Sequence, residues 1–162
     1  MPSIYSGPEI MEMAVETERG GKRFYEAVSA DATDENLKRL FGFLAAEEDR
    51  HIAAFQEVAR TVKEHPHDLA YNWEEAAQYL DAIVESKYFL GTGKALRLAG
   101  ESKTPAQALD HAIAFEKETL LFYSEVLGMV AAATRPAVSR LIAEEKSHIV
   151  KLTELRRSLV QG

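Results

Sequence analysis

Apolar residues recur at alternating spacings of three and four along four long segments of this chain. That spacing places them on one stripe of an α-helix, the stripe that faces the core of a helical bundle. The four stripes begin at Met11, Phe41, Leu109 and Val138. The pattern therefore predicts an all-α fold, a four-helix bundle.

Helix-start signals agree with this pattern. Residues 6–9 (SGPE) and 104–107 (TPAQ) each offer a capping box, with a proline inside the first helical turn. Thr33 or Asp34 can cap the second helix, and Thr134 can cap the fourth.

The connections predict the topology. The first two helices are joined near residues 29–33 and the last two near residues 131–134, and such short links make antiparallel hairpins. A long crossover separates the hairpins, and within it we expect one extra helix from Trp73 to about Glu85. Two hairpins joined by one long crossover have the ferritin-like connectivity.

The two hairpins also resemble each other in sequence. Residues 14–25 (AVETERGGKRFY) align with 112–123 (AIAFEKETLLFY), and residues 44–55 (LAAEEDRHIAAF) align with 141–152 (LIAEEKSHIVKL). Two copies indicate duplication of one helical hairpin and not a longer repeat array. We predict one ferritin-like domain over 1–162, with hairpin 1 at about 7–64, the crossover at about 65–103 and hairpin 2 at about 104–160.

Four glutamates and two histidines interrupt the apolar stripes, or seams, near the middle of the four predicted helices. They are Glu18, Glu48, His51, Glu116, Glu145 and His148. An unpaired buried carboxylate costs on the order of several kcal/mol, and four together also repel one another. Two divalent cations would cancel the four negative charges. A glutamate from two helices and a Glu-x-x-His pair from the other two is the arrangement of a metal-binding bundle.

Two alternatives bear on this prediction. A buried polar network without metal would need donors for all the carboxylate oxygens, and the seams supply few. Glu47 and Glu144 directly precede Glu48 and Glu145 and also lie one turn from a histidine. Seam position favours the second glutamate of each pair as the ligand, with the first flanking the seam.

Other residues near the predicted ligands each allow two interpretations. Tyr25 and Tyr123 follow a seam glutamate by seven residues, so each can pack in the core or donate a hydrogen bond to a ligand carboxylate. Gly20 and Gly21 lie in mid-helix, where glycine is disfavoured. They leave room for a metal-bound oxidant or allow close packing of helices.

Composition narrows the function further. The 162 residues carry a net charge of −7, which argues against a nucleic-acid partner, and the absence of cysteine excludes disulfides and thiolate-ligated metals. The N-terminal residues lack the features of a secretory signal, and no apolar stretch approaches the length of a membrane span. We expect a soluble cytoplasmic protein with no membrane association.

The sequence resembles the rubrerythrin-like branch of the ferritin-like superfamily, the di-iron carboxylate proteins. The resemblance covers all four helices, through Glu-(x)5-Phe-Tyr twice and Glu-Glu-x-x-His-Ile twice. It implies that Glu18 and Glu116 are terminal ligands, that Glu48 and Glu145 bridge two metals, and that His51 and His148 bind one metal each. It also implies a homodimer.

The chain departs from that family in two respects. Thr119 stands where rubrerythrins carry a further ligand glutamate on the third helix, so ligand exchange linked to redox state is not expected to follow the family pattern. We do not expect the C-terminal rubredoxin-like iron centre of that family, since this sequence contains no cysteine. Bacterioferritins share the six-ligand pattern, but the long crossover does not resemble theirs.

The ligand set suits iron, with manganese as an alternative. The first hypothesis is an oxidoreductase that reduces peroxide, or oxidises Fe(II) with peroxide or oxygen. The second is a non-catalytic iron-binding protein for storage, delivery or sensing, and a di-manganese catalase-like activity is a third. Because no cysteine or cofactor motif is present, an oxidoreductase would need an external electron donor such as a rubredoxin-type protein.

Overall fold

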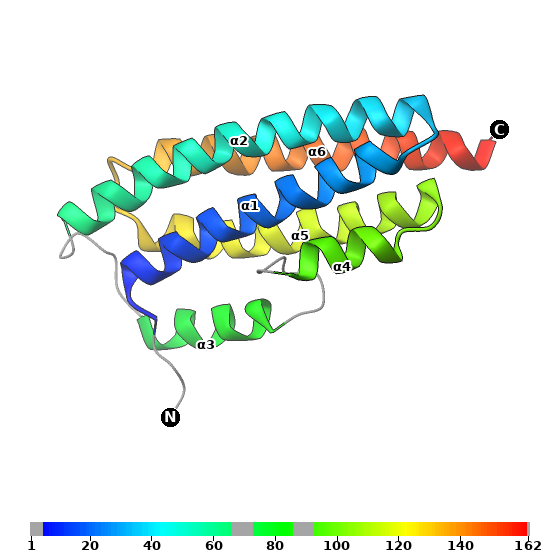
Figure 1. Ribbon diagram of the computed structural model, residues 1–162. Coiled ribbons are helices and arrows are strands. Elements are labelled where there is room, and N and C mark those ends of the chain that lie inside the picture. The colour runs from blue at the N-terminus through cyan, green and yellow to red at the C-terminus, as the bar shows by residue number, and fades with distance from the viewer. Residues whose placement is uncertain (1–4, 66–72, 86–92, 162) are drawn as a thin grey trace.

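The computed structural model describes residues 5–65, 73–85 and 93–161, and every regular element in these ranges is an α-helix. Four long helices form a bundle: α1 (Gly7–Asp31), α2 (Glu35–Glu64), α5 (Pro105–Met129) and α6 (Arg135–Gln161). Figure 1 shows α1 antiparallel to α2, and α5 antiparallel to α6. The predicted bundle of two antiparallel hairpins is confirmed.

The bundle helices begin where the sequence predicts. In α1 the Ser6 hydroxyl accepts from the Glu9 backbone N–H at 3.4 Å, and the Glu9 carboxylate accepts from the Ser6 N–H at 2.6 Å. An equivalent capping box opens α5 at residues 104–107. Of the two candidates for the cap of α2, Asp34 is the one that accepts from the Leu37 N–H, at 2.8 Å. Such caps are each worth about 1 kcal/mol.

The crossover holds two helices where the sequence predicts one. The expected helix is α3 (Trp73–Val84), and a further helix, α4 (Lys94–Glu101), follows it. α4 has only eight residues and buries only Ala95 and Leu98. So short a segment contains too little of the helical period to be recognised in the sequence. Both helices lie along the α1 and α5 side of the bundle in Figure 1.

The apolar core consists of two clusters of buried side chains, one toward each end of the bundle. One includes Ile10 and Phe55, together with side chains of α3. The other includes Phe41 and Leu152, together with side chains of α4. The layer of seam glutamates and histidines lies between them, so apolar packing on both sides stabilises the bundle and keeps water from this layer.

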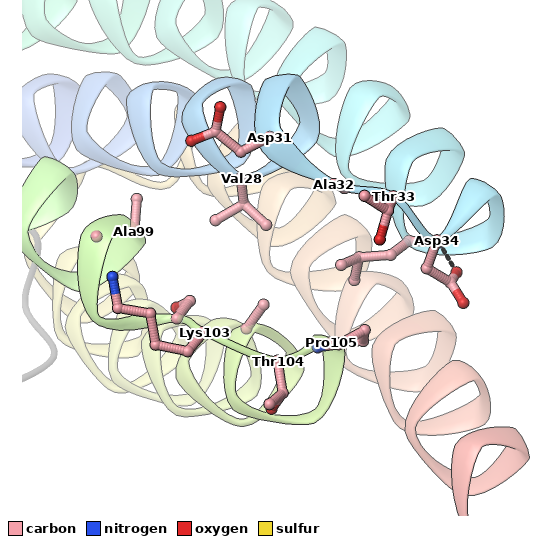
Figure 2. A pocket seen from close by; sticks show the side chains of 13 residues that line it. Val28, Asp31, Ala32, Thr33, Asp34, Ala99, Lys103, Thr104 and Pro105 are labelled. Carbon is pink, nitrogen blue, oxygen red and sulfur yellow. Dashed lines mark hydrogen bonds between the residues drawn. The ribbon is translucent and has the colours of Figure 1, made fainter.

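A surface pocket of about 320 Å³ lies at the end of the bundle where the α1–α2 and α4–α5 connections meet (Figure 2). Asp31, Asp34, Lys103 and Thr104 line it, and none of the six seam glutamates and histidines does. Among the helices that the structure describes, we find none whose length and apolar character would suit a membrane span.

Candidate metal centre

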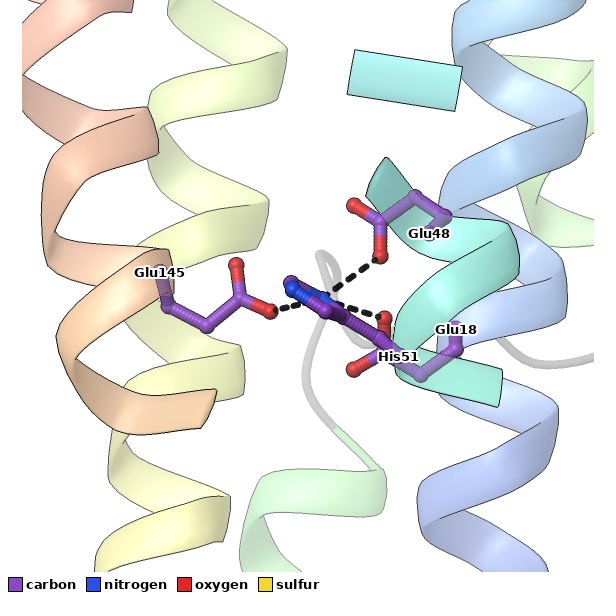
Figure 3. A group of neighbouring side chains, drawn as sticks. All are labelled: Glu18, Glu48, His51 and Glu145. Carbon is purple, nitrogen blue, oxygen red and sulfur yellow. Dashed lines mark ion pairs between the residues drawn. The ribbon is translucent and has the colours of Figure 1, made fainter. Parts of the chain in front are cut away.

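The six predicted ligands converge at the middle of the bundle. Each of the four long helices contributes one glutamate, and α2 and α6 add a histidine one turn later. All six residues are at most 1% exposed. Their potential ligand atoms form two groups, and within each group these atoms all lie within 4.8 Å of one another. The first group is Glu18, Glu48, His51 and Glu145 (Figure 3), and the second is Glu48, Glu116, Glu145 and His148.

Both imidazole rings turn Nδ1 toward the carboxylates. His51 Nδ1 lies 2.7 Å from a Glu145 oxygen, 3.3 Å from Glu18 and 3.5 Å from Glu48. These approaches lack hydrogen-bond geometry, because Nδ1 has no hydrogen-bond partner among the described residues. His148 Nδ1 lies 3.0 Å from the other oxygen of Glu145. That contact is a hydrogen bond, so only His51 Nδ1 faces several carboxylate oxygens without one, and a cation could take the place of the missing proton.

Unsatisfied buried atoms test whether a metal fits this site. In the described part of the chain nine buried side-chain polar atoms have no hydrogen-bond partner, and seven of them belong to the six candidate ligands. Each such atom costs about 1–3 kcal/mol if nothing satisfies it. Metal ions would satisfy the seven ligand atoms together. Four carboxylates with two imidazoles also form a donor set suited to iron or manganese. The residues therefore fit a pair of metal ions.

The pKa values of the clustered side chains also indicate that this site requires positive charge. Burial raises the pKa of Glu18 to about 7 and that of Glu116 to about 8. Burial and the charge of Glu18 raise the pKa of Glu48 well above its usual range. Burial opposes a charge on His148, but the nearby carboxylates of Glu116 and Glu145 raise its pKa to about 10. Without metal, bound protons must therefore supply the positive charge that this site requires.

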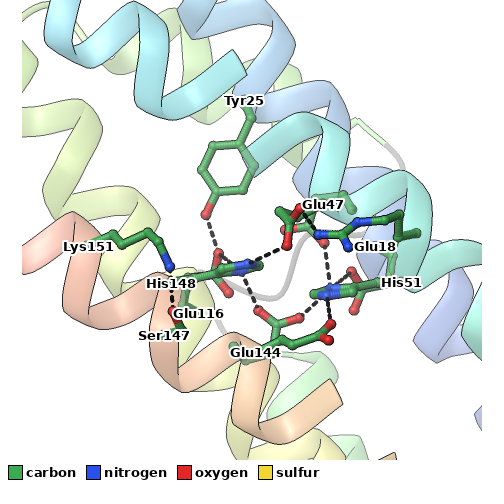
Figure 4. A network of polar contacts seen from close by, with 12 residues as sticks. Glu18, Tyr25, Glu47, His51, Glu116, Glu144, Ser147, His148 and Lys151 are labelled. Carbon is green, nitrogen blue, oxygen red and sulfur yellow. Dashed lines mark hydrogen bonds and ion pairs between the residues drawn. The ribbon is translucent and has the colours of Figure 1, made fainter. Parts of the chain in front are cut away.

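The outer nitrogen of each histidine faces a second carboxylate from the neighbouring helix (Figure 4). His51 Nε2 lies 2.9 Å from Glu144, and His148 Nε2 lies 4.0 Å from Glu47. The Glu144 side chain is 37% exposed, whereas Glu47 is 12% exposed and pairs with Arg50. Glu47 and Glu144 thus lie on the far side of the imidazole rings from the ligand groups. A carboxylate in that position orients a metal-binding histidine.

The two seam tyrosines differ in their contacts. Tyr25 is fully buried, and its hydroxyl donates to Glu116 across the bundle. It therefore packs in the core and also holds a candidate ligand. Tyr123 is equally buried, and the centroid of its ring lies 4.5 Å from that of Phe55. Its hydroxyl has no hydrogen-bond partner among the described residues.

Gly21 shows close packing beside the cluster. A Cβ atom at Gly21 would lie 2.9 Å from two ring atoms of Phe115 and 3.3 Å from Glu48 Oε1. Of the two interpretations of Gly21, the structure therefore shows close helix packing, here of α5 against α1. The sequence singles out the glycine but not the ring that packs against it, because the periodicity of α5 does not predict which residue of α1 Phe115 contacts.

The site and the fold define a class of protein, the ferritin-like carboxylate proteins, in which a four-helix bundle can hold two metal ions between its helices. The rubrerythrin family model matches residues 9–156, and the chain belongs to the rubrerythrin family. A solved structure from Thermotoga maritima, described as a ferritin-like diiron-carboxylate protein, is 25% identical in sequence with a TM-score of 0.68. The match covers 94% of this chain and 95% of that one. No curated protein matches significantly.

Proposed function

We propose that this protein is a di-iron oxidoreductase that reduces peroxide, or oxidises Fe(II) with peroxide or oxygen, inside its bundle. One observation carries the proposal. Glu48 and Glu145 belong to both groups of candidate ligands, so two metal ions held by these groups would be adjacent and would share both glutamates. The family and the Thermotoga structure, which is described as a diiron-carboxylate protein, support iron as the metal.

Each residue has a distinct role in this proposal. Glu18 and His51 would hold one iron, Glu116 and His148 the other, and Glu48 and Glu145 would lie between them. Two ferrous ions held by these residues would supply the two electrons that cleavage of one O–O bond requires.

The surrounding residues position the ligands and exclude water. The Tyr25 hydroxyl donates to Glu116 and fixes the direction of that carboxylate. Glu144 holds the outer nitrogen of His51 and keeps Nδ1 turned inward. Because the ligand residues are at most 1% exposed, reaction there proceeds away from bulk water.

The electrons for repeated turnover would come from another protein. The chain contains no cysteine and so no iron–sulfur relay of its own. We propose a small external donor of the rubredoxin type. Glu144 supports this proposal, because it contacts His51 and is also 37% exposed at its side chain, so it joins the centre to the surface between α2 and α6. A donor that docks briefly needs only a small interface there.

Stopped-flow mixing of the di-ferrous protein with hydrogen peroxide tests the function. We expect a single fast oxidation in which one peroxide, two Fe(II) and two protons give two Fe(III) and two waters. Absorbance should report one peroxide consumed per chain, and sustained turnover should require an electron donor. A Glu18→Ala variant provides the control, since it lacks one ligand and should lose the fast phase.

Other outcomes point to the alternatives. Catalytic loss of peroxide with no reductant would favour the catalase-like reading, particularly for protein loaded with manganese. If the di-ferrous form reacts with neither peroxide nor oxygen, the oxidoreductase proposal fails. The protein would then be an iron-binding protein for storage, delivery or sensing.

A further inference from the structure

The internal duplication allows the two halves of the centre to be compared position by position. The alignment of residues 14–25 with 112–123 pairs each ligand glutamate of hairpin 1 with one of hairpin 2. Beside the ligands the halves differ. Gly21 corresponds to Thr119, and Thr17 corresponds to Phe115. The centre is therefore symmetric in its ligands but not in the side chains that surround them.

One side of the centre is closed by an aromatic ring. Phe115 is 1% exposed, and its ring fills the space that a side chain at Gly21 would occupy. Glu48 Oε1 borders the same space, 3.3 Å from the Cβ position of Gly21. Neither Gly21 nor Phe115 has a side-chain hydrogen-bond donor, and the Phe115 ring occupies the space beside Gly21.

The equivalent positions on the other side carry hydroxyl groups. Thr17 is fully buried, and its hydroxyl donates to the Met13 carbonyl at 2.8 Å. Thr119 is 2% exposed, and its hydroxyl has no hydrogen-bond partner among the described residues. Thr119 follows Glu116 by one helical turn, so it lies on the same stripe of α5 beside the ligand groups.

The unsatisfied hydroxyl of Thr119 requires an explanation. A threonine that is buried without a partner destabilises the folded chain, whereas valine, of nearly the same shape, would not. Tyr123, one turn further along α5, also has a buried hydroxyl without a partner. Two unused hydroxyl groups on one face of α5 indicate a polar guest that is not part of the chain.

We propose that the Thr119 side of the centre is the binding site for the small oxygen ligand, peroxide or oxygen, and that the Thr119 hydroxyl donates a hydrogen bond to it. Phe115 fills the space beside Gly21, the position that corresponds to Thr119, so the ligand would bind beside Thr119 and not beside Gly21. This inference rests on the proposed function, because the ligand binds at the metal pair. Small anions such as azide, which bind to metals in place of peroxide, would occupy the same side.

Azide titration of the oxidised, iron-loaded protein, followed by absorption, tests the proposal. Thr119→Val keeps the shape and removes the donor, so the azide Kd should rise at least about tenfold, the lower end of the value of one hydrogen bond to a charged group. Thr119→Ser should restore tight binding. Thr17→Val is the matched control, since the Thr17 hydroxyl already bonds to the backbone, and its azide Kd should stay within about twofold of the wild type.

Stability of the metal-free protein gives a second readout that does not depend on activity. Thr119→Val removes an unsatisfied hydroxyl, so its Tm without metal should rise by about 2–6 °C. An unchanged azide Kd in Thr119→Val would overturn the proposal. So would loss of iron from that variant, because Thr119 would then support the ligands and not the guest. Wild-type protein that takes up no iron would instead contradict the proposed function.

Discussion

Glu48→Gln is expected to lose both metal ions, lowering the iron content of anaerobically loaded protein from about two per chain to less than one. Glu48 belongs to both groups of candidate ligands, so two metal ions bound there would share its charge. Glutamine preserves the volume but offers only a neutral amide, a weak ligand for a hard cation. Elemental analysis after removal of unbound Fe(II) measures the effect.

Glu47→Gln provides the matched control. Glu47 precedes Glu48 in the chain, but its carboxylate lies 4.0 Å from the outer nitrogen of His148 and belongs to neither ligand group. This variant should keep about two irons per chain. Metal loss from the Glu47 variant with retention in the Glu48 variant would show that the ligand assignment is displaced by one residue.

Unfolding does not explain the expected loss of metal in the Glu48 variant. Burial and the charge of Glu18 raise the pKa of Glu48 well above its usual range. Near neutral pH this carboxyl therefore lowers the free energy of unfolding of the metal-free protein. Glutamine removes that cost. The metal-free Glu48→Gln protein should therefore be at least as stable as metal-free wild type, measured by thermal unfolding with a chelator present.

Metal-free protein is expected to become less stable as the pH rises from about 5 to 9. The pKa of Glu18 is raised in the folded state from 4.5 to about 7, and that of Glu116 to about 8. Their protonated forms contribute stability that is complete below about pH 4.5 and is lost as the pH rises through these values. The raised pKa of His148, about 10, acts in the same direction at higher pH.

The expected shift is large enough to measure by thermal unfolding. One unit of pKa change corresponds to about 1.4 kcal/mol, and about 1 kcal/mol moves Tm by about 2–4 °C in a chain of this size. We expect Tm to be at least about 5 °C lower at pH 9 than at pH 6. Glu145, whose pKa is lowered, changes its protonation below this range.

Iron-loaded protein should show the opposite behaviour, because metal binding requires deprotonated ligands and is strengthened as protons leave. Its Tm should hold or rise between pH 6 and pH 9. A metal-free protein whose stability is flat or increases over this range would contradict the assignment of protons to the buried carboxylates.

The sequence was sufficient to predict the parts of this molecule that depend on helical period. A spacing of three and four residues determines which side chains share a stripe, so the four bundle helices and the six residues that converge in the centre could be recognised before the structure. The duplication strengthened that prediction, because it placed Glu48 and His51 in the same pattern as Glu145 and His148.

The remaining features depend on how helices pack against one another. The contact between Glu144 and His51 joins α6 to α2, and the contact between Phe115 and Gly21 joins α5 to α1. The period within one helix says nothing of the rotation and offset between two helices. The hydrogen bond from Tyr25 to Glu116 also depends on how α1 packs against α5. The helix α4 was missed for a different reason, its short length.

The number of iron ions that one chain binds tests the central claim most directly. Anaerobic titration with Fe(II), followed by optical or Mössbauer spectroscopy, should reach its end point at two ions per chain. Oxidation of that protein should give the spectrum of a coupled pair of ferric ions, because Glu48 and Glu145 belong to both positions. An end point at zero or one, or two ferric ions without coupling, would contradict a shared di-iron centre.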